Sequence, residues 1–180
     1  MTRTRTEAIR VSVSELLTLL LGESYAPREI LEENRLIHHR LGLEGDEEYN
    51  LVLGPLDAMG RQGSDPSGAR VVFASRPVVL TCRPDLVLNG EVYELKVLRR
   101  YSDRARVLTH GLLQLQLELY ALGLERGKLL IYRHHDGEIE ELEVRREDSI
   151  ALEALRTYLS VLEARSRLLS KLSELLRSSV

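Results

Sequence analysis

The dipeptide Asn89-Gly90 restricts the fold of this chain more than any other feature of its sequence. It separates two runs in which apolar and polar residues alternate, DLVL before it and EVYELKV after it. Asn-Gly between such runs is the strongest short-range signal for a β-hairpin with a two-residue turn. A turn of this type places Asp85 directly opposite Glu94, with the Cβ atoms about 4.5–5.5 Å apart on one face of the hairpin.

Lys96 extends this pair into a cluster of three charged residues. Because side chains alternate along a strand, Lys96 lies on the same face as Glu94. Two opposed carboxylates destabilise a sheet, so they need a cation, which is either the ammonium of Lys96 or a metal ion. Oxygen-rich sites suit Mg²⁺ or Mn²⁺, which lower the pKa of bound water and stabilise charge on a reacting phosphate. The alternative is a surface carboxylate pair bridged by Lys96 alone.

Helical and strand patterns alternate along the rest of the chain. Ser12 and Glu15 have the spacing of a capping box, and Gly22 ends that helix. The dipeptide Asp136-Gly137 indicates a second hairpin turn. We predict helices over 12–22, 27–41, 102–124 and 150–176, strands over 49–53, 71–75, 78–82, 85–88 and 91–97, a β-hairpin over 128–144, and a loop over 54–68. This order predicts an α/β or α+β domain with a mixed sheet.

Composition excludes several classes of protein. A chain of 180 residues fits one domain, and no apolar run is long enough to cross a bilayer. The N-terminus lacks the apolar core of a signal peptide, so a cytoplasmic location is expected. Cys82 is the only cysteine, which excludes an internal disulfide and a four-cysteine iron–sulfur cluster. The 53 charged residues beside three Gln and three Asn are typical of proteins from thermophiles.

A known family shares the acidic cluster. Pro84-Asp85, followed after eight residues by Glu94-Leu95-Lys96, resembles the PD-(D/E)xK signature of the restriction-endonuclease-like nucleases. This resemblance implies metal-dependent hydrolysis of phosphodiester bonds, with both carboxylates and the backbone carbonyl of Leu95 holding Mg²⁺ or Mn²⁺ and Lys96 assisting the water. It also implies a restriction-endonuclease-like core, in which helices flank a central mixed β-sheet.

Two further motifs resemble the RecB-like branch of that superfamily. Gln116 and Tyr120 match its QxxxY motif, and their spacing of four places both side chains on one helical face. Residues 14–42 are similar to the opening of the CRISPR-associated RecB-like exonucleases, with Ala26-Pro27-Arg28 where that family has Cys-Pro-Arg. This likeness implies that Gln116 and Tyr120 position the cleaved strand, and that His38 is a further metal ligand. On a helical wheel His38 faces inward and His39 outward.

The resemblance covers residues 12–145, so we predict a single nuclease domain over 1–180. It comprises N-terminal helices (1–45), the nuclease core (46–146) and a C-terminal helical extension (147–180). The leucine-rich final helix packs into the core, or it contacts a second copy of the chain or a partner protein. Nothing in the sequence separates these alternatives.

A basic segment follows the predicted acidic strand and leads into the helix of Gln116. We predict that its arginines contact DNA phosphates and that its tyrosine stacks on a base, with the ordinary solvated basic stretch as the alternative. His110 lies upstream of Gln116 and is a further candidate for phosphate contact. The predicted DNA-binding residues are Arg99, Arg100, Tyr101, Arg104, Arg106 and His110.

Three functions are compatible with these residues. The leading prediction is a divalent-metal-dependent exonuclease that acts on single-stranded or frayed DNA ends. The second is a structure-specific or sequence-specific endonuclease of the same fold. The third is a non-catalytic DNA-binding or scaffold module in a DNA-repair or CRISPR-adaptation complex.

Overall fold

The computed structural model describes residues 8–22, 28–43, 45, 47–53 and 76–178. Two mixed β-sheets lie side by side, and helix α4 (Arg104–Leu122) contacts strands of both. The first sheet has the order β1-β3-β2, and the second has the order β4-β5-β6-β7. The predicted α+β class with mixed β-structure flanked by helices is confirmed, and the strands are divided between these two sheets.

The three-stranded sheet combines a parallel and an antiparallel pair. Strand β3 (Val78–Cys82) lies in its centre, parallel to β1 (Ile9–Ser12) and antiparallel to β2 (Tyr49–Leu53). β1 was missed by sequence reasoning, because four residues directly before a helix are too few to establish an alternating pattern. The predicted strand at 71–75 and the loop at 54–68 lie outside the described residues.

The four-stranded sheet carries the predicted hairpin. Strand β4 (Leu86–Leu88) pairs antiparallel with β5 (Glu91–Leu98), in the register that the sequence predicted. Asn89 and Gly90 both have positive φ, at 52° and 79°, as the predicted turn requires. β5 pairs parallel with β6 (Arg126–Arg133), which pairs antiparallel with β7 (Ile139–Arg145) through the second predicted hairpin.

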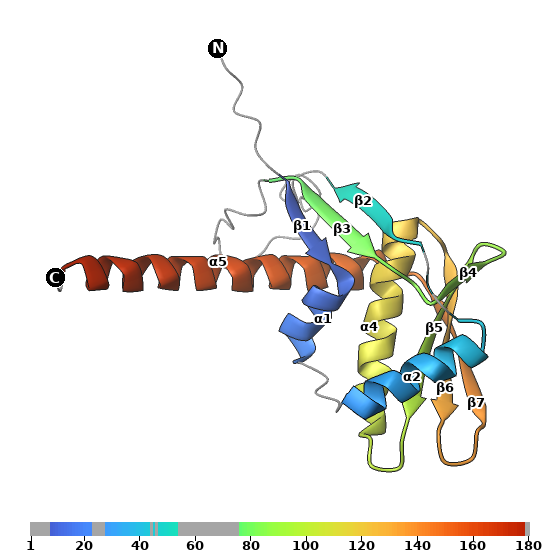
Figure 1. Cartoon of the computed structure of the whole chain (residues 1–180). Coiled ribbons are helices and arrows are strands. Elements are labelled where there is room, and N and C mark those ends of the chain that lie inside the picture. Colours follow the sequence, from blue (N-terminus) through green and yellow to red (C-terminus); the bar gives the residue numbers. More distant parts are fainter. Residues whose placement is uncertain (1–7, 23–27, 44, 46, 54–75, 179–180) are drawn as a thin grey trace.

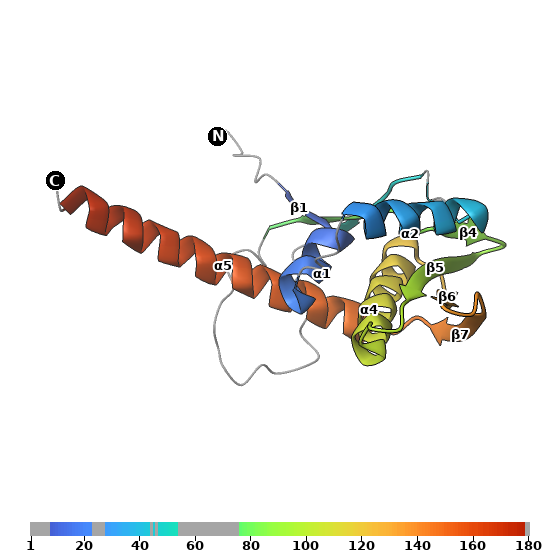
Figure 2. The ribbon, with the colours of Figure 1, turned by 60° about the horizontal axis from the view of Figure 1, so that its bottom comes forward.

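Helices cover both faces of this second sheet. On one face Val92 and Leu98 of β5 pack with Leu115 and Leu119 of α4. On the other face lies α2 (Arg28–Arg40), where Ile37 packs with Leu95. β5 therefore lies between α4 and α2 (Figures 1 and 2). Its alternate side chains pack into two different layers.

The remaining helices enclose the first sheet. Helix α1 (Val13–Leu21) begins at the N-cap Ser12 with the predicted capping box and ends at Gly22. It packs with α4 and with the first half of α5 (Asp148–Ser178), where Leu155 and Leu159 are fully buried. No helix in the described parts of the chain has the length and apolar character needed to cross a membrane.

The second half of α5 extends away from the body of the molecule, as both ribbon views show (Figures 1 and 2). The final helix is thus one continuous element whose first half joins the core and whose second half does not. Contact with a second chain through the second half stays a prediction. Its exposed leucines are Leu168, Leu169, Leu172, Leu175 and Leu176.

Candidate active site

Asp85 and Glu94 meet at the open end of the β4–β5 hairpin. Asp85 directly precedes β4, and the register continues from the Leu86–Tyr93 pair to place it opposite Glu94. Its Oδ2 accepts a hydrogen bond from the backbone N–H of Leu95 at 2.7 Å, which fixes the carboxylate against β5. The negative charge of Asp85 contributes to raising the pKa of Glu94, as expected of neighbouring carboxylates.

His38 approaches the same carboxylate from helix α2. Its Nδ1 lies 2.8 Å from the backbone carbonyl oxygen of Asn34, to which it donates, so Nε2 faces Asp85 Oδ2 at 3.3 Å. Asp85 raises the pKa of His38 by this hydrogen bond, although burial opposes the shift. A neutral imidazole would turn a lone pair towards the carboxylate, so the pair needs a proton or a cation between them. The predicted orientations of His38 and His39 are confirmed, since His39 is exposed.

Glu94 and Lys96 form a buried ion pair on the face of β5 that α4 covers. Lys96 Nζ donates to Glu94 Oε1 and to Gln114 Oε1, each at 2.6 Å. Glu94 is only 2% exposed, and its Oε2 has no hydrogen-bond partner among the described residues. Burial raises the pKa of Glu94 to about 7 against the opposing charge of Lys96. Although burial alone would lower the pKa of Lys96, the carboxylate of Glu94 raises it, so the amine remains charged.

A second buried carboxylate, Glu118, was missed by sequence reasoning. It is 1% exposed, and its Oε1 accepts a hydrogen bond from Gln114 Nε2 at 2.9 Å. Burial, followed by the charge of Glu94, raises the pKa of Glu118 well above its usual range. The available signal was the spacing of Gln114 and Glu118, four residues apart in an otherwise leucine-rich stretch of helix. The site therefore contains a chain of hydrogen bonds from Glu94 through Lys96 and Gln114 to Glu118.

Gly111 allows α4 to lie directly against Lys96. A Cβ atom at this position would come within 2.7 Å of Leu129 Cδ1 and 3.0 Å of Lys96 Cγ. Any side chain at position 111 would therefore push the helix away from the sheet. The absence of a side chain here brings Gln114 within hydrogen-bond distance of the ammonium.

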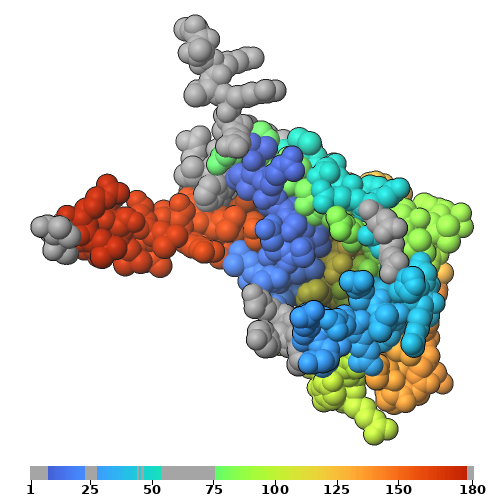
Figure 3. All heavy atoms as spheres, in the orientation of Figure 1, coloured from blue at the N-terminus to red at the C-terminus, as the bar shows by residue number. Residues whose placement is uncertain are grey.

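Lys96 and His38 face a cavity of about 270 Å³, whereas Asp85 and Glu94 are not among the residues that line it. His38, Lys96 and Arg106 line it together with His110, whose pKa is lowered to about 4 by burial and by the charges of Lys96 and Arg106. His110 is therefore neutral near pH 7. The space-filling view shows α4 at the bottom of a hollow between α1 and α2 (Figure 3). A ligand can thus approach the charged cluster from the α1–α2 side.

Gln116 lies on a different side of α4 from Gln114. Its Nε2 donates to the backbone carbonyl of Arg145 at 2.8 Å, and its Oε1 accepts from the backbone N–H of Glu147 at 2.7 Å. Tyr120 packs at the edge of the core near the start of α5. The structure therefore does not bring these two residues to the acidic cluster. Their role in positioning DNA remains a prediction.

Substitutions at Gln116 distinguish a structural role, in which its side chain holds the backbone before α5, from a role in positioning DNA. Gln116→Leu leaves the partly buried backbone groups of residues 145 and 147 without their partner, so unfolding should become easier by about 2 kcal/mol. Gln116→Glu is a partial variant, because it can still accept from the N–H of Glu147 but cannot donate to the carbonyl of Arg145. Urea unfolding of both variants checks this order. A large loss of DNA cleavage by Gln116→Leu at unchanged stability would instead support the positioning role.

The basic segment after β5 is only partly available to DNA. Arg99 is held by Glu33 Oε2 at 2.8 Å and by Asn34 Oδ1 at 2.9 Å, so it ties α2 to the end of β5. Arg104 makes a two-pronged ion pair with Glu140. These two predicted phosphate contacts therefore already have carboxylate partners. The other predicted residues are exposed (Arg100, Tyr101 and Arg106) or half-buried (His110).

Comparisons with known proteins support the fold. No known protein-family profile matches the sequence, and no curated protein is similar to it. The crystal structure of SSO0001 is similar over 88% of this chain and 79% of that chain, with 19% identity and a TM-score of 0.55. At this identity the likeness shows the fold alone. The α+β architecture with two mixed sheets is consistent with a restriction-endonuclease-like core.

Two less similar structures are of one enzyme, the alkaline exonuclease LHK-Exo from Laribacter hongkongensis. The first is 16% identical, with a TM-score of 0.47 over 94% of this chain and 93% of that chain. The second, LHK-Exo in complex with dAMP, is 14% identical, with a TM-score of 0.43 over 92% of this chain and 81% of that chain.

The donor atoms fit a hard divalent cation in their chemistry. Glu94 Oε2 is buried without a partner among the residues that the structure describes, and the Nε2 of a neutral His38 would need a cation between itself and Asp85. Oxygen with one imidazole nitrogen is a donor set that Mg²⁺ or Mn²⁺ accepts. Within the described residues, however, no three His, Cys, Asp or Glu side chains already form a metal-binding group. They are arranged as two pairs, Asp85 with His38 and Glu94 with Lys96.

Proposed function

We propose that this protein is a divalent-metal-dependent deoxyribonuclease, acting as an exonuclease on single-stranded or frayed DNA ends. The observation that carries the proposal is the group of Asp85, Glu94 and Lys96 at the end of one hairpin, of which Lys96 lines a cavity together with His38. Buried charges of this kind are costly to maintain, and such groups concentrate at functional sites. The PD-(D/E)xK resemblance of the same three residues supports hydrolysis of phosphodiester bonds.

The proposed cofactor is Mg²⁺ or Mn²⁺. Asp85, Glu94 and His38 would hold it, together with the backbone carbonyl of Leu95. When bound, the ion supplies a water of lowered pKa and positive charge for the phosphate oxygens.

Lys96 acts as a donor in this proposal. Glu94 and Gln114 take two of its three N–H groups and fix the direction of the third. Because its pKa is raised, the amine keeps its proton and does not act as a base. It therefore donates to a phosphate oxygen or orients the attacking water, and it opposes the charge that develops during hydrolysis.

Three exposed residues of the basic segment contribute to strand binding. Arg106 lines the cavity beside Lys96 and provides positive charge for a phosphate. Arg100 and Tyr101 are exposed at the end of β5, where a strand that leaves the site can contact them. Arg99 and Arg104 support these groups through their ion pairs with α2 and β7.

A cleavage assay with an Asp85 variant tests the function. Labelled single-stranded and duplex DNA is incubated with Mg²⁺, Mn²⁺ or EDTA. Asp85→Asn keeps an acceptor for the N–H of Leu95 but loses the charge, so we expect cleavage to fall about 10²-fold or more. Asp136→Asn, in the β6–β7 turn, is the matched control and should retain wild-type rates.

The products distinguish the proposed functions from one another. Mononucleotides released from a strand end indicate an exonuclease, whereas nicking of a closed circle indicates an endonuclease. DNA binding in EDTA without cleavage in either metal would refute catalysis and favour the scaffold function.

A further inference from the structure

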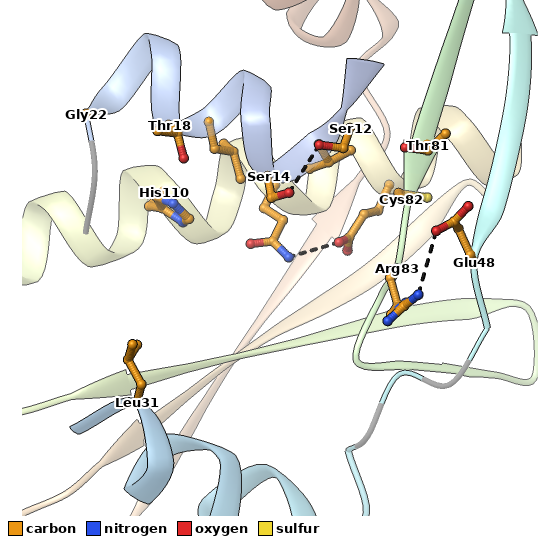
Figure 4. A pocket seen from close by; sticks show the side chains of 14 residues that line it. Ser12, Ser14, Thr18, Gly22, Leu31, Glu48, Thr81, Cys82, Arg83 and His110 are labelled. Atoms are coloured by element: carbon orange, nitrogen blue, oxygen red, sulfur yellow. Dashed lines mark hydrogen bonds and ion pairs between the residues drawn. The ribbon is translucent and has the colours of Figure 1, made fainter. Parts of the chain in front are cut away.

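A second cavity, of about 720 Å³, adjoins the candidate active site. It lies between α1, α4 and the end of β3 (Figure 4). Gly22 and His110 line both cavities, so the second cavity continues from the one that contains Lys96. The site described above uses none of its volume.

Glu118 supplies an unsatisfied hydrogen-bonding atom to this cavity. The side chain is 1% exposed and lines the cavity together with Gln114. Gln114 bonds to its Oε1, while Oε2 has no hydrogen-bond partner within the described part of the chain. A buried polar atom without a partner is costly, and each such atom in a native protein requires an explanation. A ligand that bonds to Oε2 would remove this cost.

The charges around the cavity exclude an anion as that ligand. Arg83 is paired with Glu48 at 3.6 Å, and His110 is neutral near pH 7. Glu48 balances the charge of Arg83, and Glu118 adds no positive charge, so the described lining offers a phosphate no unpaired cation. The ligand must therefore be neutral where it enters, with the phosphate remaining near Lys96 and Arg106.

The rest of the lining fits a flat ring that carries polar groups at its edge. Leu17 and Leu31 provide apolar surface, and the hydroxyls of Ser14, Thr18 and Thr81 provide hydrogen-bonding groups. Ser14 and Thr18 are labelled on the α1 side of the cavity in Figure 4, where His110 points in from α4. A nucleobase combines these properties, because it has apolar faces and donors and acceptors at its edge.

We propose that this cavity binds an unpaired nucleobase of the DNA strand whose phosphate lies at Lys96, and that Glu118 bonds to the exocyclic amine edge of that base. The proposal rests on the proposed nuclease function and specifies its substrate. In a duplex the amine edge is occupied by base pairing, so only an unpaired base can enter. The cavity thus selects single-stranded or frayed DNA and favours bases that carry an amine.

Cleavage of DNA that lacks bases tests this assignment within the nuclease reaction. Thr18 is exposed on α1, so Thr18→Leu fills the cavity without disturbing the core, and Thr157→Leu on α5 is the matched control. Substrates are single strands with or without abasic residues at their three terminal positions. For the wild type we expect abasic ends to lower kcat/KM about tenfold or more. Thr18→Leu should cleave normal strands about as slowly as abasic ones, and Thr157→Leu should behave as the wild type.

Nucleoside binding tests the cavity without any cleavage. In EDTA, an NMR titration compares deoxycytidine, which carries the amine, with deoxyuridine, which lacks it. We expect the wild type to bind deoxycytidine several-fold more tightly, and Glu118→Met to lose that preference. Thr18→Leu should bind both nucleosides at least tenfold more weakly.

Together, the cleavage experiment and the nucleoside titration distinguish failure of the base-binding proposal from failure of the nuclease function. Cleavage that is unaffected by abasic ends and by Thr18→Leu, with no nucleoside binding, would overturn the base-binding cavity and leave the nuclease intact. Absence of any cleavage, together with binding of deoxycytidine that Thr18→Leu abolishes, would refute the nuclease and retain the cavity as a nucleoside site.

Discussion

Replacement of Lys96 by methionine is expected to lower the rate constant for DNA cleavage by about 10²–10³-fold, the usual effect of removing one preorganised donor. Methionine has similar length and volume, so the space beneath Gly111 stays filled. The variant loses the charge that Glu94 and Gln114 hold at 2.6 Å and that faces the cavity. Single-turnover cleavage of labelled single-stranded DNA measures this loss.

The same substitution should also change how folding depends on pH. Without the ammonium, Glu94 becomes a buried carboxylate with no cation, and its pKa should rise above the value of about 7 that it has beside Lys96. The variant therefore folds with Glu94 protonated and loses stability in alkaline buffer. Lys128→Met is the matched control for cleavage, because it removes a lysine of β6 that pairs with Glu141 of β7. Near-normal cleavage by Lys96→Met would place the catalytic site elsewhere.

The second large effect concerns the metal-free protein, whose stability should fall as the pH rises from about 4.5 to about 7. Glu94 has a pKa of about 7 when folded, compared with the ordinary value of 4.5 for a glutamate. Below pH 4.5 Glu94 is protonated in both the folded and the unfolded state, so its contribution to stability is fully present. Between these values the unfolded chain releases its proton and the folded chain keeps it, so the free energy of unfolding decreases. The total decrease is about 3 kcal/mol, at 1.4 kcal/mol per pKa unit.

Glu94→Gln removes this contribution. Over the same pH window, the free energy of unfolding of this variant should decrease by about 3 kcal/mol less than that of the wild type. Urea unfolding in EDTA at intervals between pH 4.5 and 8 measures both curves. The raised pKa values of His38 and Glu118 act in the same direction, and the variant loses the part of each shift that comes from the charge of Glu94. Parallel curves for the two proteins would show that Glu94 ionises normally despite its burial.

Local sequence signals predicted most of the elements. The turn at Asn89-Gly90, the capping box of Ser12 with Glu15 and the stop at Gly22 depend on residues within four positions of one another. Their geometry is therefore determined by the chain itself. The same reasoning predicted the inward orientation of His38, because helical periodicity alone separates it from His39. Strand β1 and the division into two sheets were missed, because they depend on partners far away in the sequence.

Part of the site was predicted. The predicted part involves residues close together in the sequence, and the missed part involves residues far apart in it. Asp85, Glu94 and Lys96 lie on one short hairpin, so turn geometry and strand alternation predicted that they are neighbours. Their division into an Asp85–His38 pair and a Glu94–Lys96 pair depends on α2 and α4. Gln114 and Glu118 join them only because α4 crosses β5, and Gly111 allows this close approach. The same packing directs Gln116 to the backbone at the start of α5 and gives Arg99 and Arg104 carboxylate partners. No sequence pattern predicts these contacts.

The sequence alone therefore determined which residues form the turn, the caps and the opposed carboxylates, because each depends on neighbours along the chain. Only the tertiary structure decided that Glu94 and Glu118 are buried, that His38 faces Asp85, and that two cavities adjoin at His110. These properties follow from the packing of α1, α2 and α4 around the sheets, which excludes water from the carboxylates. Burial, rather than residue type, is what shifts their pKa values and leaves Glu118 with an oxygen for a ligand.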